Sequence, residues 1–202
     1  MKKIGEGWQY SVYDLNNGRV LKRFHSPIKS YWVILKTIFP FREDSFTKIP
    51  EFSRGMKKTA LRSFNVLKTK NIPADNIANP HFINELDFEQ DKVTPIHDLF
   101  SRSDVLSMKN TIDKFIFFNK KLLGLGVIDK SFNITKNYGL NTKDEIVLID
   151  IGELFDSNDA IKKQMIDRAW DKSYVAGCIQ NEEVRRYFIE EMDKNFGLSH
   201  VQ

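Results

Sequence analysis

The feature that most constrains this sequence is a strand-like run that ends in a carboxylate and a glycine, at residues 145–152. Glu145 is followed by four apolar residues, three of them β-branched, then by Asp150 and, two positions later, by Gly152. A short apolar run of this kind, bounded by polar residues, is typical of a buried strand. A carboxylate at the end of such a strand sits on a rigid element, a common way to present a metal ligand. The sequence therefore predicts a ligand site at the C-terminal end of this strand.

Two more candidate site residues, Asp129 and Asn137, lie upstream in a polar loop that follows a glycine-containing helix end at residues 124–126. An Asp, an Asn and a second Asp, in this order, are the groups that phosphoryl transfer needs. One of them orients the attacking hydroxyl and two hold Mg²⁺. Asn133 lies in the same loop and is an alternative choice for the metal-binding Asn.

The N-terminal residues predict three strands with a glycine bend between the first two. Gly5 and Gly7 interrupt an alternating pattern, residues 16–18 (Asn-Asn-Gly) form a strong turn signal, and residues 19–24 read as the next strand. Glycines allow backbone amides to approach phosphate groups closely. An ordinary turn is the other interpretation of the two glycines, and an exposed strand lysine is the other interpretation of Lys22.

In their order along residues 4–155, these segments resemble the protein-kinase-like fold. The glycine segment has the spacing of the kinase glycine loop, residues 20–22 (Val-Leu-Lys) resemble its lysine strand, and residues 150–152 (Asp-Ile-Gly) resemble its Asp-Phe-Gly element. The resemblance implies that ATP and Mg²⁺ are the cofactors. It assigns nucleotide binding to Gly5, Gly7, Val12 and Lys22, catalysis to Asp129 and Lys22, and metal binding to Asn137 and Asp150.

Three departures from the kinase pattern stand out. Tyr10 replaces the third glycine of the loop, where a large side chain would cap or crowd the phosphate site. Residues 127–128 (Val-Ile) replace the His-Arg pair before the catalytic Asp. Residues 53–73 look like the corresponding part of the bacterial lipopolysaccharide-core kinases, but Ala60 stands where those carry a glutamate. These departures favour an alternative, a catalytically inactive pseudokinase that acts as a binding or regulatory module.

The resemblance implies an α+β fold in two lobes, residues 1–96 and 97–202. We expect a small lobe of about five antiparallel strands plus one helix, and a compact, mainly helical large lobe. The apolar stripe of residues 56, 60, 61, 64 and 67 predicts an amphipathic helix over residues 51–70. Residues 81–88 and 92–96 read as strands joined by a turn at 89–91, with the hinge between the lobes at residues 94–99. One helix is expected to begin at Ser101 or Ser103, with Ser103-Asp104 as its cap. Two more are expected to begin at residues 157–159 (Ser-Asn-Asp) and at Asn181.

Residues 25–50 are rich in aromatic and basic side chains. Residues 30–36 predict a short helix, and a second apolar run covers residues 38–41. Lys29, Tyr31, Trp32 and Lys36 form either a basic-aromatic surface for an acidic substrate or a segment that packs its aromatics on the small lobe.

The composition limits the classes of partner and the cellular location that we expect for this protein. The net charge is +4. This charge would suit an anionic partner, such as a nucleotide or an anionic surface that the protein contacts peripherally. The other interpretation is that the excess Lys and Arg side chains are only solvated at the surface. Nothing in the sequence resembles a nucleic-acid-reading motif, so a nucleic-acid partner is not expected. The single cysteine, Cys178, excludes an internal disulfide framework. No apolar run is long enough to span a membrane and no apolar leader follows Met1, so we expect a cytoplasmic protein.

These observations predict an ATP- and Mg²⁺-dependent phosphotransferase. Its acceptor is a hydroxyl of a sugar, of a lipopolysaccharide core or of a protein, and the sequence leaves these open. The pseudokinase is the alternative. A basic nucleic-acid-binding domain is a third class, supported only by the net charge.

Overall fold

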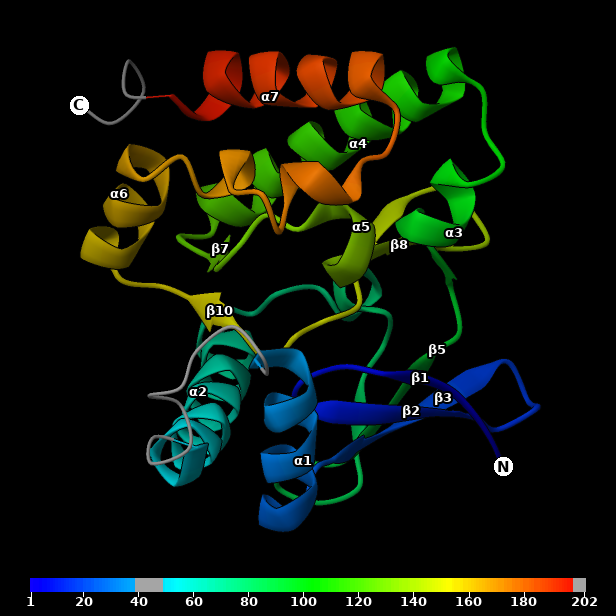
Figure 1. Ribbon diagram of the computed structural model, residues 1–202, viewed down its shortest axis with the longest axis vertical. Helices are drawn as coiled ribbons and strands as arrows, with labels where there is room; N and C mark the ends of the chain where they lie inside the picture. Colours follow the sequence, from blue (N-terminus) through cyan, green and yellow to red (C-terminus); the bar gives the residue numbers. More distant parts are fainter. Residues whose placement is uncertain (39–48, 198–202) are drawn as a thin grey trace.

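The structure is a computed structural model that describes residues 1–38 and 49–197. The fold is α+β and has two lobes, with an antiparallel sheet and two helices in the N-terminal part and a mainly helical C-terminal part (Figure 1). The strands are β1 (Lys2–Glu6), β2 (Tyr10–Asp14), β3 (Arg19–Phe24), β4 (His81–Phe82), β5 (Phe88–Asp91), β6 (Thr94–Pro95), β7 (Ile128–Asp129), β8 (Tyr138–Leu140), β9 (Ile146–Leu148) and β10 (Leu154–Phe155). The helices are α1 (Pro27–Ile38), α2 (Ile49–Thr69), α3 (Ile96–Phe100), α4 (Val105–Gly124), α5 (Ile134–Asn137), α6 (Asn158–Ile166) and α7 (Glu182–Phe196), with short 3-10 turns at Ala74–Ile77, Ala169–Asp171 and Ala176–Cys178.

The N-terminal sheet has five strands in the order β1-β2-β3-β5-β4, with every described pair antiparallel. The first three strands and the turn between β2 and β3 lie where the sequence predicts them. Asn16 and Gly18 take positive φ angles of 59° and 79° in that turn, a conformation that Asn and Gly tolerate best.

The predicted turn at residues 89–91 is wrong. These residues belong to β5, which pairs with β3, and the chain turns instead at residues 83–87. The side-chain oxygen of Asn84 accepts hydrogen bonds from the backbone N–H groups of Leu86 (2.9 Å) and Asp87 (2.7 Å), which closes the turn earlier. The predicted strand 92–96 shrinks to β6, which pairs with β8 of the C-terminal part rather than with the N-terminal sheet.

Two helices accompany the N-terminal sheet, where the kinase-like layout implies one and the sequence patterns predict both. α1 is longer than the predicted helix 30–36 and packs against α2. Pro27 occupies its first position, where a proline costs no helical hydrogen bond. α2 buries four of the five predicted apolar positions, with Leu61 half-buried. Most of the predicted apolar run 38–41 lies outside the described residues.

The C-terminal part is built on helix α4, which packs against α7 (Figure 1). All three predicted caps are present, because the side chains of Asp104, Ser157 and Asn181 each accept a backbone N–H at the start of α4, α6 and α7. Two small sheets, β6-β8-β9 and β7-β10, lie between these helices and the N-terminal sheet.

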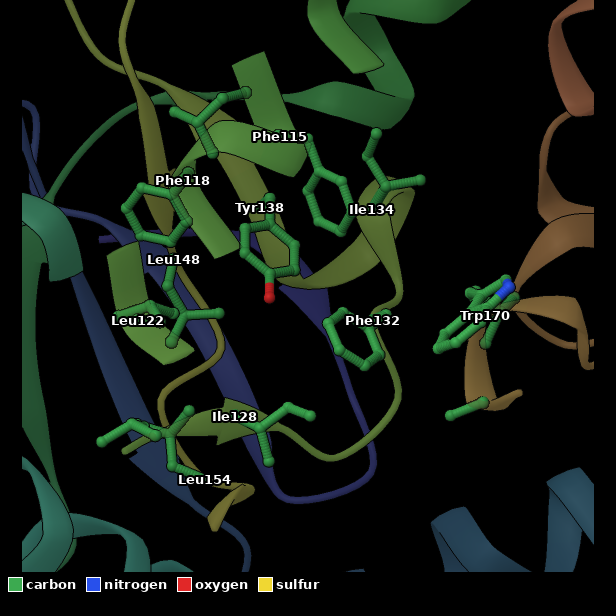
Figure 2. Packing of buried hydrophobic residues seen from close by; sticks show 14 of the residues in the cluster. Phe115, Phe118, Leu122, Ile128, Phe132, Ile134, Tyr138, Leu148, Leu154 and Trp170 are labelled. Atoms are coloured by element: carbon green, nitrogen blue, oxygen red, sulfur yellow. The ribbon is translucent and has the colours of Figure 1, made fainter. Parts of the chain in front are cut away.

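The largest group of buried apolar residues runs through both lobes. In its C-terminal part, Tyr138 lies among Phe115, Phe118 and Leu122, and Phe132 packs edge-on against Trp170 (Figure 2). This core fixes β7, which ends in Asp129, and the β8–β9 hairpin, which Asn137 precedes and Asp150 follows.

Candidate functional site

Asp129 and Asn137 form the centre of the candidate site. Asp129 ends β7, where it pairs with Leu154 of β10, and it is 0% exposed. Asn137 ends α5, and its amide Nδ2 lies 3.2 Å from each carboxylate oxygen of Asp129 and 3.3 Å from the Ser131 hydroxyl. Two residues eight positions apart are thus brought into direct contact by the loop and short helix between them.

Burial changes the chemistry of the Asp129 carboxylate. The pKa of Asp129 is raised to about 7, mainly because the carboxylate loses its surrounding water. The hydrogen bond from the Asn137 amide opposes this rise, and the negative charges of Glu153 and Asp150 add to it. A carboxylate with a pKa near neutrality can both accept and release a proton at physiological pH, as a general base must.

Asp150 is held next to Asn137 by the backbone. The carbonyl of Asn137 accepts hydrogen bonds from the N–H groups of Ile149 (2.7 Å) and Asp150 (3.2 Å). The Asp150 side chain is half-buried, and its Oδ1 lies 3.4 Å from the backbone nitrogen of Gly152. The two proposed metal ligands therefore come from adjoining pieces of backbone.

Lys22 reaches the same place from the N-terminal sheet. Its side chain is 8% exposed, its ammonium donates to the Ile149 carbonyl, and it lies 5.8 Å from the centre of the Phe88 ring. Burial lowers the pKa of Lys22, and the nearby charge of Asp150 opposes that change. Within the described ranges, no carboxylate lies within ion-pair distance of Lys22. Ala60, at the position of the kinase glutamate, is fully buried on α2.

The predicted nucleotide-binding residues Val12, Gly5 and Gly7 lie on the first two strands and the bend between them. Val12 pairs with Lys22 across β2 and β3, so both side chains are on one face of the sheet. A Cβ atom at Gly5 or Gly7 would approach its neighbours no closer than 3.6 Å, so packing within the fold does not demand glycine there. The N–H of Gly7 donates to the Tyr10 carbonyl (2.8 Å), which closes the bend into a tight turn.

Two residues of this bend, Gln9 and Tyr10, face the site. Gln9 contacts Gly152, since a Cβ at residue 152 would lie only 2.3 Å from the Gln9 Oε1 atom. The Tyr10 ring packs edge-on against Phe24 and Phe88. Its burial raises the pKa of Tyr10, and the charge of Asp150 adds to that effect. The sequence marked Tyr10 as a departure from the glycine pattern, but it gave no signal for Gln9.

Ser63 is a second residue that the sequence analysis missed. It lies fully buried on α2, donates from its hydroxyl to the Ile151 carbonyl (2.6 Å) and accepts from the Leu154 N–H (2.8 Å). This single hydroxyl ties α2 to the segment that follows Asp150. Its place next to the apolar stripe of α2, three residues after Ala60, was the available signal.

The alternative ligand Asn133 has another role. Its side-chain oxygen accepts from the Lys136 N–H (3.3 Å) and from the Thr135 hydroxyl (3.0 Å), and its amide donates to the Tyr174 carbonyl (3.1 Å). Asn133 therefore caps α5 and anchors it to the C-terminal segment, whereas Asn137 contacts Asp129.

The basic-aromatic residues of α1 do not form one surface. Lys29 bonds to Glu6 (2.9 Å) and Ser11 (2.5 Å), while Tyr31 packs against Met56. Trp32, which is 55% exposed, and Lys36 face outward. Tyr31 also lines a groove of about 840 Å³ between α1, α2 and the turn at residues 83–87, on other elements than those that carry Asp129 and Asp150.

Residues 1–38 and 49–197 lack two features that bear on function. They contain no cluster of three or more His, Cys, Asp and Glu side chains able to hold a metal ion. None of their helices is long and apolar enough to cross a membrane. A cation at Asp150 and Asn137 would therefore need further oxygen ligands from a substrate or water, which is the usual arrangement for Mg²⁺ bound with phosphates.

Comparison with known proteins places the chain in no family. No family model and no curated protein matches the sequence. Among solved structures, the complex of Rv3197 with erythromycin from Mycobacterium tuberculosis is similar at 9% sequence identity and a TM-score of 0.47. The match covers 89% of this chain and 53% of the other, so this chain spans about half the length of that structure.

Proposed function

We propose that this chain has a protein-kinase-like fold and is an ATP- and Mg²⁺-dependent phosphotransferase that acts on a hydroxyl acceptor. The observation that carries the proposal is the convergence of Lys22, Asp129, Asn137 and Asp150 around the backbone of residues 149–150. These residues come from separate segments of the chain, and together they provide a cation, two oxygen ligands and a base.

The buried ammonium of Lys22 supports the proposal that the site binds an anionic ligand. A charge removed from water without a counter-charge destabilises the fold, and an adjacent anion offsets that cost. Lys22 meets a carbonyl rather than a carboxylate, so a phosphate group beside it would supply the missing negative charge.

The site residues divide the chemistry among themselves. Bound ATP with Mg²⁺ would supply the phosphoryl group. Asp150 and the side-chain oxygen of Asn137 would hold the cation, and Lys22 would hold phosphate oxygens. Asp129 would accept a hydrogen bond from the acceptor hydroxyl, orient it and take its proton, for which a pKa of about 7 suits it. Sugar, lipopolysaccharide-core and protein hydroxyls remain the acceptor classes. This reaction suits a cytoplasmic protein.

The first experiment measures the melting temperature with ATP, with and without Mg²⁺, for the wild type, for Asp150→Asn and for the exposed control Asp159→Asn. A ligand at about 100 times its dissociation constant adds about 2.7 kcal/mol of stability. We expect a Mg²⁺-dependent upward shift in the wild type and the control, and no such shift in Asp150→Asn. An equal shift in all three proteins would contradict the assignment of Asp150.

A pseudokinase is the second candidate. Ala60 leaves Lys22 without a carboxylate partner on α2, and the N–H of Gly7 is already bonded to Tyr10. Both observations favour a protein that has the protein-kinase-like fold but does not catalyse phosphoryl transfer. Release or transfer of the ATP γ-phosphate by the wild type, lost in Asp129→Asn, would exclude it. ATP binding without any turnover would establish it.

A further inference from the structure

The inner side of the glycine bend carries three buried polar atoms without partners. Gln9 is 7% exposed and Tyr10 is 5% exposed. Neither polar atom of the Gln9 carboxamide, nor the Tyr10 hydroxyl, has a hydrogen-bond partner in the part of the chain that the structure describes. Such groups are uncommon in folded proteins, and each one calls for an explanation.

These atoms face the candidate site. The Gln9 carboxamide contacts Gly152, two residues after Asp150, and the Tyr10 ring lies 3.5 Å from the position that a Cβ at residue 152 would take. The ammonium of Lys22 bonds to the carbonyl immediately before Asp150. The unpartnered carboxamide and the buried cation therefore approach the Asp150 segment together.

Packing alone does not explain a glutamine at this position. A buried carboxamide without partners destabilises the fold relative to one with partners, and a leucine of similar size avoids that cost. Elsewhere in the described chain, the buried carboxamide of Gln90 donates to the Ile77 carbonyl at 3.0 Å. The unpartnered state belongs to Gln9 in particular.

We propose that Gln9 is a specificity-determining residue of the phosphate site, whose carboxamide N–H donates to a terminal phosphate of the bound nucleotide. This inference rests on the proposed function and deepens it. An amide donor beside Lys22 suits an anionic oxygen. Because Gln9 faces the segment of Asp150, it would contact the phosphates that the cation also contacts. It would thus favour nucleoside triphosphates over monophosphates.

The test is Gln9→Leu, which keeps the side-chain size and removes both polar atoms. Melting temperatures are measured without ligand and across titrations of ATP with Mg²⁺ and of AMP, with Gln180→Leu as the same change at an exposed position. We expect the ligand-free melting temperature of Gln9→Leu to be equal to or above that of the wild type. A lost hydrogen bond to a charged group predicts roughly tenfold or more weaker ATP binding, with AMP binding unchanged.

Each other outcome is informative. Unchanged ATP affinity in Gln9→Leu would overturn the inference, and tighter ATP binding would show that the carboxamide blocks the site. If the wild type gives no ATP shift, the proposed function fails first and the inference fails with it. If ATP raises the melting temperature of the wild type, Gln9→Leu and Gln180→Leu equally, the inference about Gln9 is overturned while the proposed function stands.

Gly152 offers an independent test, because an alanine there must displace the Gln9 carboxamide. We expect Gly152→Ala and Gln9→Ala to weaken ATP binding to a similar extent. The double variant should bind no more weakly than either single variant, since both act on one group. Additive losses would show that Gly152 acts independently of Gln9 and would contradict the inference.

Discussion

The candidate site has two walls that differ in how their polar groups are satisfied. The aspartate wall, residues 129–137 with Asp150, is internally hydrogen-bonded, since Asn137 contacts Asp129, Ser131 and the backbone of residues 149–150. The loop wall, residues 7–10, buries the Gln9 carboxamide and the Tyr10 hydroxyl without hydrogen-bond partners among residues 1–38 and 49–197. One wall is thus organised before any ligand arrives, while the other has hydrogen-bonding capacity left for one. The predictions below test this difference from the largest effect to the smallest.

Asp129→Asn should give the largest change in stability. The pKa of Asp129 is about 7 in the folded protein and near 4 when unfolded. Between these values the folded state keeps a proton that the unfolded state has lost, so the free energy of unfolding of the wild type falls as pH rises from about 4 to 7. The amide variant has no such proton. Above pH 7 it should exceed the wild type by up to about 4 kcal/mol.

Urea unfolding without Mg²⁺ at pH 4.5 and pH 8 measures this difference, with Asp159→Asn as the exposed control. Relative to the wild type, the free energy of unfolding of Asp129→Asn should be slightly higher at pH 4.5 and much higher at pH 8. The control should match the wild type at both pH values. A gain that is the same at both pH values would mean that Asp129 is already ionised at low pH. The aspartate wall would then stabilise the ionised carboxylate of Asp129 despite its burial.

Ser63→Ala should lower stability by about 2–3 kcal/mol, because the Ile151 carbonyl and the Leu154 N–H both lose a buried partner. Thr69→Ala, at the exposed end of the same helix, is the matched control and should cost less than about 0.5 kcal/mol. Chemical denaturation measures both. Equal losses would indicate that the Ser63 hydroxyl does not support the segment after Asp150.

The smallest effect compares one substitution in two places. Tyr138→Phe removes a hydroxyl that donates to Asn119 (3.0 Å) beneath the aspartate wall and should cost about 1–2 kcal/mol. Tyr10→Phe removes an unpartnered hydroxyl from the loop wall and should leave stability unchanged or raise it by up to about 1 kcal/mol. Melting temperatures of the two variants should move in opposite directions. Destabilisation by Tyr10→Phe would mean that the Tyr10 hydroxyl of the loop wall also has a hydrogen-bond partner.

Local patterns were sufficient for much of the fold. Asp104, Ser157 and Asn181 are short polar residues ahead of periodic apolar stripes, and such a cap needs only its own helix to form. The turn at residues 83–87 was missed because Asn84, Glu85 and Asp87 are as polar as residues 89–91. Alternation alone does not decide which of them turns and which pairs with β3.

The candidate site was accessible from the sequence only in part. Asp129 and Asn137 are eight residues apart, and the contact between them follows from one loop and one short helix. Ser63 and Ile151 are 88 residues apart, and no local pattern indicates that they meet. Gln9 is a still harder case, because its distinguishing property is the absence of a partner among the described residues.

The long separation between Ser63 and Ile151 has a consequence for folding during synthesis. At about 5–20 residues per second, the ribosome takes several seconds to add the 88 residues that follow Ser63, up to and including Ile151. Throughout that interval α2 has been made, while the carbonyl and N–H groups that its hydroxyl will bind do not yet exist. The candidate site therefore assembles late, after most of the chain has been translated. Until then, the Ser63 hydroxyl lacks both of the backbone partners that it has in the folded protein.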